Sequence, residues 1–177
     1  FNDLHTDFLD RLTAIGAAPE DVDLVVCTHL HTDHVGWNTR LVDGVWVPTF
    51  PNASYLLPQV DFDRLSEASR SADKEDPFGY IGAFEDSVVP VAKAGKAEFW
   101  RDEYAIDDAL KLSSVPGHSA GAAVLLITSD GQHAVLAGDI VQHPMQILDP
   151  DQPNILDADR PLAIASRRRI LGWAADN

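Results

Sequence analysis

Three of the seven histidines in this chain stand close together, in a segment that also contains an aspartate. Residues 29–34 read His-Leu-His-Thr-Asp-His and follow directly on the mostly apolar run 23–28. Two histidines at i and i+2 on an extended turn can both face one metal ion, and the aspartate and the third histidine can serve a second. Imidazole and carboxylate suit Zn²⁺, and also Fe or Mn. The segment therefore predicts a metal site after a buried strand, with a solvated histidine-rich loop as the plain alternative.

The histidine-rich segment also resembles a known signature. Residues 28–36 (THLHTDHVG) are similar to the signature of the metallo-β-lactamase-fold hydrolases. Residues 116–121 (PGHSAG) resemble the family's second motif, a Gly-His turn before a strand, and residues 137–139 (AGD) resemble its third, a Gly-Asp at a strand end. The motifs stand in family order, and the resemblance covers the chain from about residue 20 onward. It implies an α+β fold, the metallo-β-lactamase-like αββα sandwich.

The resemblance implies six metal ligands drawn from all three motifs: His29, His31, Asp33, His34, His118 and Asp139. His29, His31 and His118 would hold the first ion. Asp33 and His34 would hold the second ion, and Asp139 would bridge the two. The family's last metal histidine normally follows a further helix, whereas no histidine follows His143 here. We therefore expect residues 1–177 to be one partial domain that lacks N-terminal strands and a C-terminal ligand segment.

The function implied is a dinuclear, zinc-type hydrolase in which a metal-bridging hydroxide attacks an ester-like bond of a small molecule. Residues 36–40 (GWNTR) and 46–53 (WVPTFPNA) look like the methyl-parathion-hydrolase-like and lactonase-like branch, so lactones, esters and organophosphates are the candidate substrates. Asp33 would act in catalysis by shuttling a proton. Two alternatives stay open: an enzyme with one iron that oxidises a persulfide, and a non-catalytic metal-binding remnant.

Several other side chains have both a functional and a structural interpretation. Four of them are candidates for the wall of a substrate pocket: Trp37, Trp46, Phe50 and His143. The three aromatic residues are equally compatible with the core, and His143 with an ordinary loop. Ser119 beside His118 suggests a nucleophilic pair only weakly, because neighbours on an extended chain point apart. We expect His5 and His133 at the surface.

Composition limits the partners. The 177 residues include 28 acidic and 13 basic side chains, a formal net charge of −15. This balance disfavours a nucleic-acid surface and docking on anionic membranes. No apolar run approaches the roughly 20 residues of a membrane span. The single cysteine, Cys27, excludes a disulfide within the chain and is expected in the core. We expect a cytoplasmic protein with a small-molecule substrate, in which a homodimer partner could wall the pocket.

The periodicity and the turn residues place these motifs on predicted elements. Helices are expected near residues 4–15, over 59–72 and over 159–177, the last with Asp159 as N-cap. Strands are expected at 23–28, at 54–57, and as a meander of 88–91, 97–100 and 110–115. Hairpins are expected at Asp43-Gly44 and Asp130-Gly131, so the sheets should be largely antiparallel. Arg167, Arg168 and Arg169 should form one polar patch, and the acidic runs 61–63 and 73–76 should be solvated.

Overall fold

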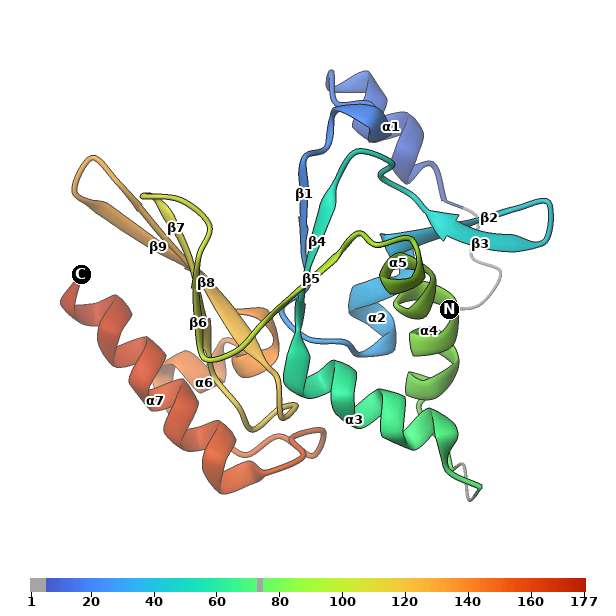
Figure 1. The fold of residues 1–177 in the computed structure, drawn as a ribbon. Coiled ribbons are helices and arrows are strands. Elements are labelled where there is room, and N and C mark those ends of the chain that lie inside the picture. The colour runs from blue at the N-terminus through green and yellow to red at the C-terminus, as the bar shows by residue number, and fades with distance from the viewer. Residues whose placement is uncertain (1–5, 73–74) are drawn as a thin grey trace. The chain divides into compact units, whose positions relative to one another are not determined.

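A computed structural model describes residues 6–72 and 75–177 (Figure 1). Its α-helices are α1 Phe8–Ala14, α2 Thr32–Val35, α3 Gln59–Arg70, α4 Tyr80–Ser87, α5 Val89–Lys93, α6 Met145–Leu148 and α7 Arg160–Asp176, and its 3₁₀ turns are η1 Pro19–Asp21, η2 Gly36–Asn38 and η3 Gly138–Ile140. Its strands are β1 Leu24–Val26, β2 Thr39–Val42, β3 Val45–Pro48, β4 Ser54–Pro58, β5 Ala97–Trp100, β6 Glu103–Ala105, β7 Leu110–Ser114, β8 Ala123–Ser129 and β9 Gln132–Leu136. His5 lies outside the described residues.

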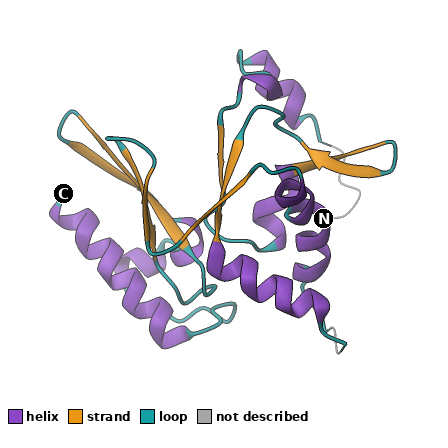
Figure 2. Ribbon diagram, viewed as in Figure 1, coloured by secondary structure: helices purple, strands orange, loops and turns teal. Residues whose placement is uncertain are grey.

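The chain divides into two compact units. The first comprises the residues up to Leu57 together with Arg64–Phe99, and the second comprises Pro58–Asp63 together with Trp100–Asn177. Helices and strands occur in both (Figure 2), so the expected mixture of α and β structure is confirmed. None of the helices in the described ranges combines the length and the apolar character that a membrane span needs.

The first unit is organised around a three-stranded sheet in the order β1-β4-β5. β1 pairs with β4 in parallel, with Val25 opposite Tyr55. Parallel strands are usually buried, and the last four residues of β4 are indeed buried. The Tyr55 hydroxyl accepts a hydrogen bond from the backbone N–H of Phe50 (3.0 Å) and donates one to the backbone oxygen of Asn38 (3.2 Å). This phenol therefore fixes the chain on both sides of the β2–β3 hairpin.

The predicted hairpin at Asp43-Gly44 is confirmed. β2 and β3 pair antiparallel with Val42 opposite Val45, so the loop has two residues. Both loop residues have positive φ, 51° for Asp43 and 80° for Gly44. That combination is typical of a type I′ turn, whose twist matches that of the strands.

The predicted meander is wrong in its first part. Val88 is not in a strand, and Val89–Lys93 form α5, in which the Ala92 N–H bonds the Val88 oxygen at 3.1 Å. Pro90 lies in the first turn, where a helix tolerates the missing N–H of proline, so a β-branched run forms a helix here. β5 then joins the sheet of β1 and β4, and the Tyr55 N–H bonds the Lys96 oxygen at 2.8 Å.

The second unit is built on an antiparallel sheet in the order β6-β7-β8-β9. Leu112 lies opposite Leu125 in the β7–β8 pair, and the β8–β9 hairpin turns at Asp130-Gly131 as predicted. A buried cluster joins the sheet to α7, which supplies Ala163 and Ile170. α7 begins as predicted, because the Asp159 side chain accepts a hydrogen bond from the Leu162 N–H at 3.0 Å.

The three consecutive arginines of α7 do not form one polar patch. Successive helical residues point about 100° apart, so three in a row cannot share a face. The Arg167 side chain is fully buried, whereas that of Arg168 is 62% exposed and pairs with Asp151. Arg169 donates to the backbone oxygen of Ser114 at the end of β7. The prediction of one polar patch is therefore wrong.

Gly117 offers a test of how closely α7 approaches the turn after β7. Its φ is +136°, and a Cβ built on it would lie 2.2 Å from the backbone nitrogen of Ala163. We expect Gly117→Ala to lower the free energy of unfolding by at least ~2 kcal/mol, through both strain and overpacking. Gly172 is the matched control, because a Cβ there meets nothing within 4 Å. Gly172→Ala should stabilise α7 by up to about 1 kcal/mol.

Denaturant unfolding of both variants measures the difference. Equal stabilities of the two variants would show that the turn and α7 do not meet as closely as the structure indicates.

Candidate metal centre

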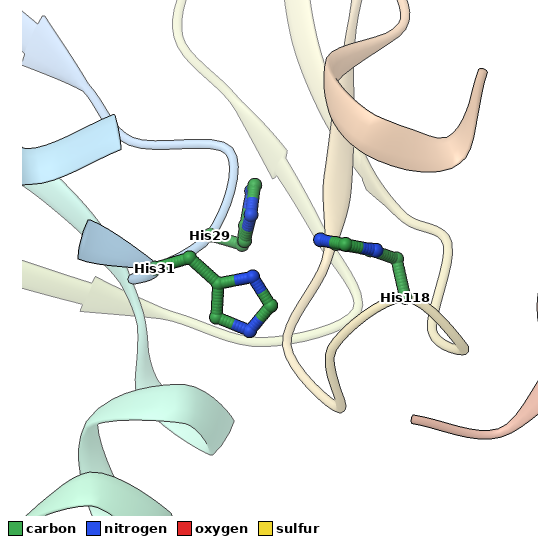
Figure 3. A group of neighbouring side chains, drawn as sticks. All are labelled: His29, His31 and His118. Carbon is green, nitrogen blue, oxygen red and sulfur yellow. The ribbon is translucent and has the colours of Figure 1, made fainter. Parts of the chain in front are cut away.

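The first unit gathers three imidazoles directly after β1. The ring centroids of His29 and His31 are 4.5 Å apart, and those of His29 and His34 are 4.0 Å apart. A ligand nitrogen of His29 lies within 4.8 Å of one on each of the other two rings. Figure 3 shows the His29 and His31 rings next to each other on the loop that leaves β1. The structure thus brings together the three histidines of the predicted segment.

Each of two rings in this group is held by a neighbouring side chain. The Thr28 hydroxyl oxygen lies 3.2 Å from His29 Nδ1. If Nδ1 carries the proton, it donates to Thr28 and leaves the lone pair of Nε2 directed at a metal position. The His31 ring stacks on Tyr80, the first residue of α4, with centroids 4.2 Å apart and planes only 3° from parallel. The orientation of both rings is therefore fixed within the first unit.

Asp33 and His34 lie side by side in the one-turn helix α2. Asp33 Oδ2 is 3.5 Å from His34 Nε2, and 56% of the Asp33 side chain is exposed. The Thr32 hydroxyl donates to the backbone oxygen of Phe78 at 3.1 Å, which ties the start of α2 to the segment before α4. The predicted ligand Asp33 therefore lies on the solvent side of the histidine group, beside His34.

Cys27, which precedes the histidine segment, is a core residue as expected. It is buried, and burial raises the pKa of its thiol from 9.0 to about 11. The Asn38 amide lies against its sulfur, with its Nδ2 at 3.4 Å. A neutral thiol is a poor metal ligand, so Cys27 does not compete with the imidazoles.

The second unit holds His118 in the turn between β7 and β8. His118 is buried, and its Nε2 lies 3.4 Å from Asp139 Oδ2 in η3. Its Nδ1 lies 3.4 Å from Asp157 Oδ1 and 3.2 Å from Gln142 Nε2. This unit thus brings together one predicted histidine and the predicted carboxylate of Asp139. The labelled side chain of His118 appears in Figure 3.

A buried carboxylate from α3 shapes the His118 turn. Asp61 accepts a hydrogen bond from the Ser119 hydroxyl (2.8 Å) and one from the Gly121 N–H (2.7 Å). Gly121 has no room for a side chain, because a Cβ would lie 2.8 Å from the Asp61 carboxyl carbon. Asp61 is only 5% exposed, so the prediction of a solvated acidic run is wrong at this residue. The Ser119 hydroxyl is engaged with Asp61, in line with the weak case for a nucleophile.

Sequence reasoning also missed Asp157. Its side chain is fully buried between His118 and Arg167, whose Nη2 lies 3.4 Å from Asp157 Oδ2. Arg167 further donates to the backbone oxygens of Ile140 (2.7 Å), Pro150 (2.9 Å) and Gln152 (2.9 Å). No short motif marks this contact, because its two partners lie far from Asp157 in the sequence. His118 is 39 positions away and Arg167 is 10 positions away.

The four residues proposed for a pocket wall lie in different settings. Trp37 is 36% exposed and packs against Phe8, with ring centroids 5.1 Å apart. Trp46 is also partly exposed, whereas Phe50 is buried in the core. His143 is exposed, and its Nδ1 accepts a hydrogen bond from the Met145 N–H at 3.1 Å. His133 is exposed on β9, as expected.

The fold and these residues agree with a comparison against protein families. The model described as the Metallo-beta-lactamase superfamily matches residues 3–172. This chain belongs to the metallo-beta-lactamase superfamily. The family and the fold inferred from the three motifs are thereby confirmed, and divalent metal binding is a property of this fold.

Two curated members of the superfamily are similar in sequence. The N-acyl homoserine lactonase AttM of Rhizobium radiobacter is 31% identical over 123 residues, which are 67% of this chain and 41% of AttM. The ribonuclease TTHA0252 of Thermus thermophilus is 29% identical over 146 residues, 80% of this chain and 32% of that protein. The chain therefore spans less than half the length of either relative.

Two solved structures resemble this fold. The hydrolase AbOPH is 25% identical with a TM-score of 0.80, over 97% of this chain and 59% of that one. AidC, a dizinc quorum-quenching lactonase, is 23% identical with a TM-score of 0.73, over 99% of this chain and 61% of AidC. Lactonases thus occur among both the sequence relatives and the structural relatives, in line with the lactonase-like branch.

The role of Asp61 can be tested by its removal. Asp61→Ala leaves two buried donors, the Ser119 hydroxyl and the Gly121 N–H, without their acceptor. We expect a loss of about 2–3 kcal/mol in the free energy of unfolding. The matched control is Asp63→Ala in the same helix, which breaks a half-exposed ion pair with Arg101 and should cost less than about 1 kcal/mol. Similar losses in the two variants would contradict the anchoring role.

Proposed function

We propose that this chain forms the core of a dinuclear metal-dependent hydrolase that opens lactones or related esters of small molecules. The observation that carries the proposal is that the Nδ1 atom of each of two buried imidazoles, His29 and His118, lies next to an oxygen of another side chain. His29 Nδ1 faces the Thr28 hydroxyl, and His118 Nδ1 faces the Asp157 carboxylate. Histidines that bind a metal through one nitrogen commonly donate the other N–H to such a group.

The donor set fits a zinc-type ion. The first unit offers imidazoles, and the second offers His118 with a carboxylate 3.4 Å away. Nitrogen and oxygen donors of this kind suit Zn²⁺, and also Fe or Mn. We propose that His29, His31 and His118 hold one ion, that Asp33 and His34 hold a second, and that Asp139 bridges them. The superfamily membership and the local geometry within each unit support this assignment.

Two divalent ions held by these residues would lower the pKa of a water molecule and polarise the ester oxygen of a substrate. The chain's own contribution is orientation. Gln142 donates to Asp139 Oδ2 at 3.0 Å, and Tyr80 holds the His31 ring. Asp33, solvent-exposed beside His34, is proposed to take up and pass on the proton of the attacking water at its carboxylate.

Lactones are the first substrate class to test. AttM, the relative at 31% identity, is named an N-acyl homoserine lactonase, and AidC is described as a dizinc lactonase. The similarity to a ribonuclease makes RNA the competing substrate. A net charge of −15 disfavours a polyanionic substrate, because phosphate backbones need basic surfaces. Trp37 and Trp46, both partly exposed, are proposed to contact the apolar part of a small substrate.

The test is a metal and substrate analysis of the full-length protein. We expect two zinc-type ions per chain and turnover of lactones or aryl esters in a panel that includes phosphotriesters, β-lactams and RNA. Asp139→Ala should lower the metal content and reduce turnover at least about 10³-fold, since the proposed bridging ligand is lost. His133→Ala is the matched control, because His133 lies exposed on β9.

Full activity of Asp139→Ala would overturn the proposal. A single iron with persulfide oxidation would assign the alternative chemistry instead, and cleavage confined to RNA would replace the small-molecule substrate.

A further inference from the structure

Phe78 is a large aromatic residue that lies mostly in solvent beside the histidine segment of the first unit. It is 60% exposed. Its backbone oxygen accepts a hydrogen bond from the Thr32 hydroxyl at 3.1 Å, and Thr32 stands between His31 and Asp33 in the sequence. Single exposed apolar residues are common on protein surfaces, so the setting of Phe78 decides what its exposure signifies. Here the neighbouring segment is the one that supplies proposed metal ligands on both sides of Thr32.

The Phe78 ring is also connected to this segment through a second aromatic residue. Its centroid is 5.4 Å from that of Tyr80, with the ring planes 25° apart. Tyr80 in turn stacks on His31, with centroids 4.2 Å apart and planes 3° from parallel. The three rings form an aromatic series that begins at a proposed metal ligand and ends at the exposed Phe78. Contacts between aromatic rings are directional, so this series positions Phe78 relative to His31.

The turn that carries Phe78 is held by hydrogen bonds of its own. Asp76 Oδ2 accepts from the backbone N–H groups of Ile81 (3.0 Å) and Gly82 (3.1 Å), and the Asp76 backbone oxygen accepts from the Gly79 N–H at 3.2 Å. Gly79 has a φ of +72°, which glycine adopts without strain and which leads the chain into α4. An aromatic side chain on an anchored turn is preorganised, because little conformational entropy is lost when a ligand covers it.

Two acidic residues adjoin this turn in the described structure. Glu75 is exposed and directly precedes Asp76, and Asp33, whose side chain is 56% exposed, directly follows Thr32. Carboxylates repel an anionic group on a ligand. An uncharged apolar group, by contrast, gains from the surface that it and Phe78 together remove from water. The surroundings of Phe78 therefore favour an uncharged, apolar group.

We propose that Phe78 is a specificity-determining residue that binds the apolar substituent of the substrate, and that the preferred substrates are uncharged lactones or esters with an alkyl or acyl chain of several carbons. This inference rests on the proposed hydrolase function and adds to it the chemical class of the group beside the reacting ester. Each methylene that reaches the Phe78 ring loses contact with water and thereby strengthens binding.

The first measurement follows turnover by the metal-loaded full-length protein along a homologous series. The substrates are aliphatic γ-lactones with side chains from methyl to hexyl. We expect kcat/KM to rise about 2- to 4-fold for each added methylene, mainly through a lower KM. A lactone whose side chain ends in a carboxylate should have a kcat/KM at least about 10-fold lower than the methyl-ended lactone of equal length. Equal values for these two lactones would overturn the preference for uncharged substituents.

Two substitutions and a control assign the length dependence to Phe78. Phe78→Ala should reduce the rise to less than about 1.5-fold per methylene and leave kcat/KM for the methyl-substituted lactone within about 2-fold. Phe78→Leu keeps an apolar side chain and should retain most of the rise. Ile15→Ala is the matched control, because Ile15 is an apolar residue that is 81% exposed at the end of α1. It should leave the rise unchanged.

The second measurement does not depend on turnover. Calorimetric titration of the same proteins with sodium alkanoates from butanoate to decanoate measures the affinity gained per methylene. The wild-type protein should gain affinity along the series, and Phe78→Ala should lose about as much of this gain as it loses in kcat/KM. Nuclear magnetic resonance of the Phe78 ring should show shifts that grow with the length of the alkanoate.

The outcomes separate this inference from the proposed function. Turnover of lactones with no dependence on chain length, or an unchanged dependence in Phe78→Ala, would overturn the role of Phe78 and leave the hydrolase function standing. An equal effect of Ile15→Ala would also overturn it. A protein that opens no lactone or ester would contradict the proposed function, whereas the alkanoate titration would still show whether Phe78 binds an apolar chain.

Discussion

The buried ion pair between Arg167 and Asp157 is the interaction on which the second unit depends. Two charges without solvent are costly unless each is paired and fully hydrogen-bonded. Arg167 meets that condition by donating to three backbone oxygens, one at the end of η3 and two in the segment between η3 and α7. That segment therefore folds around the guanidinium, and the same contact presents Asp157 to His118. The packing of α7 and the orientation of the candidate ligand His118 thus depend on the same buried contact.

The two units fix their histidines by different physical means. In the first, a stacked ring and a hydroxyl hold His31 and His29, so orientation comes from packing and a neutral contact. In the second, the turn around His118 is held by two buried carboxylates, Asp61 and Asp157. Charge-assisted contacts are stronger and more directional, and they suit a turn whose glycines supply no packing of their own.

The sequence predicted the elements whose signals are local. The Asp43-Gly44 hairpin, β8 with its return strand, and the Asp159 cap were all foreseen, because turn chemistry and capping act over a few residues. α5 was missed because residues 88–91 are of types that favour strands. Their helical conformation depends on tertiary packing, which a local sequence pattern does not reveal. Asp61, Asp157 and Arg167 were missed for a related reason. Their partners lie up to about 60 positions away, and a charged residue in a sequence reads as solvated until such a partner is known.

The setting of Cys27 carries a consequence for the alkaline limit of the fold. Its thiol pKa is about 11 in the folded chain and near 9.0 when solvated. Well below pH 9 the thiol is neutral in both the folded and the unfolded state, and its contribution to stability does not depend on pH. Between about pH 9 and 11 the thiol ionises in the unfolded chain but stays neutral in the folded core. Each increase in pH over this range therefore lowers the free energy of unfolding. The buried thiol just before the histidine segment thereby makes the stability of the fold fall progressively over this alkaline range.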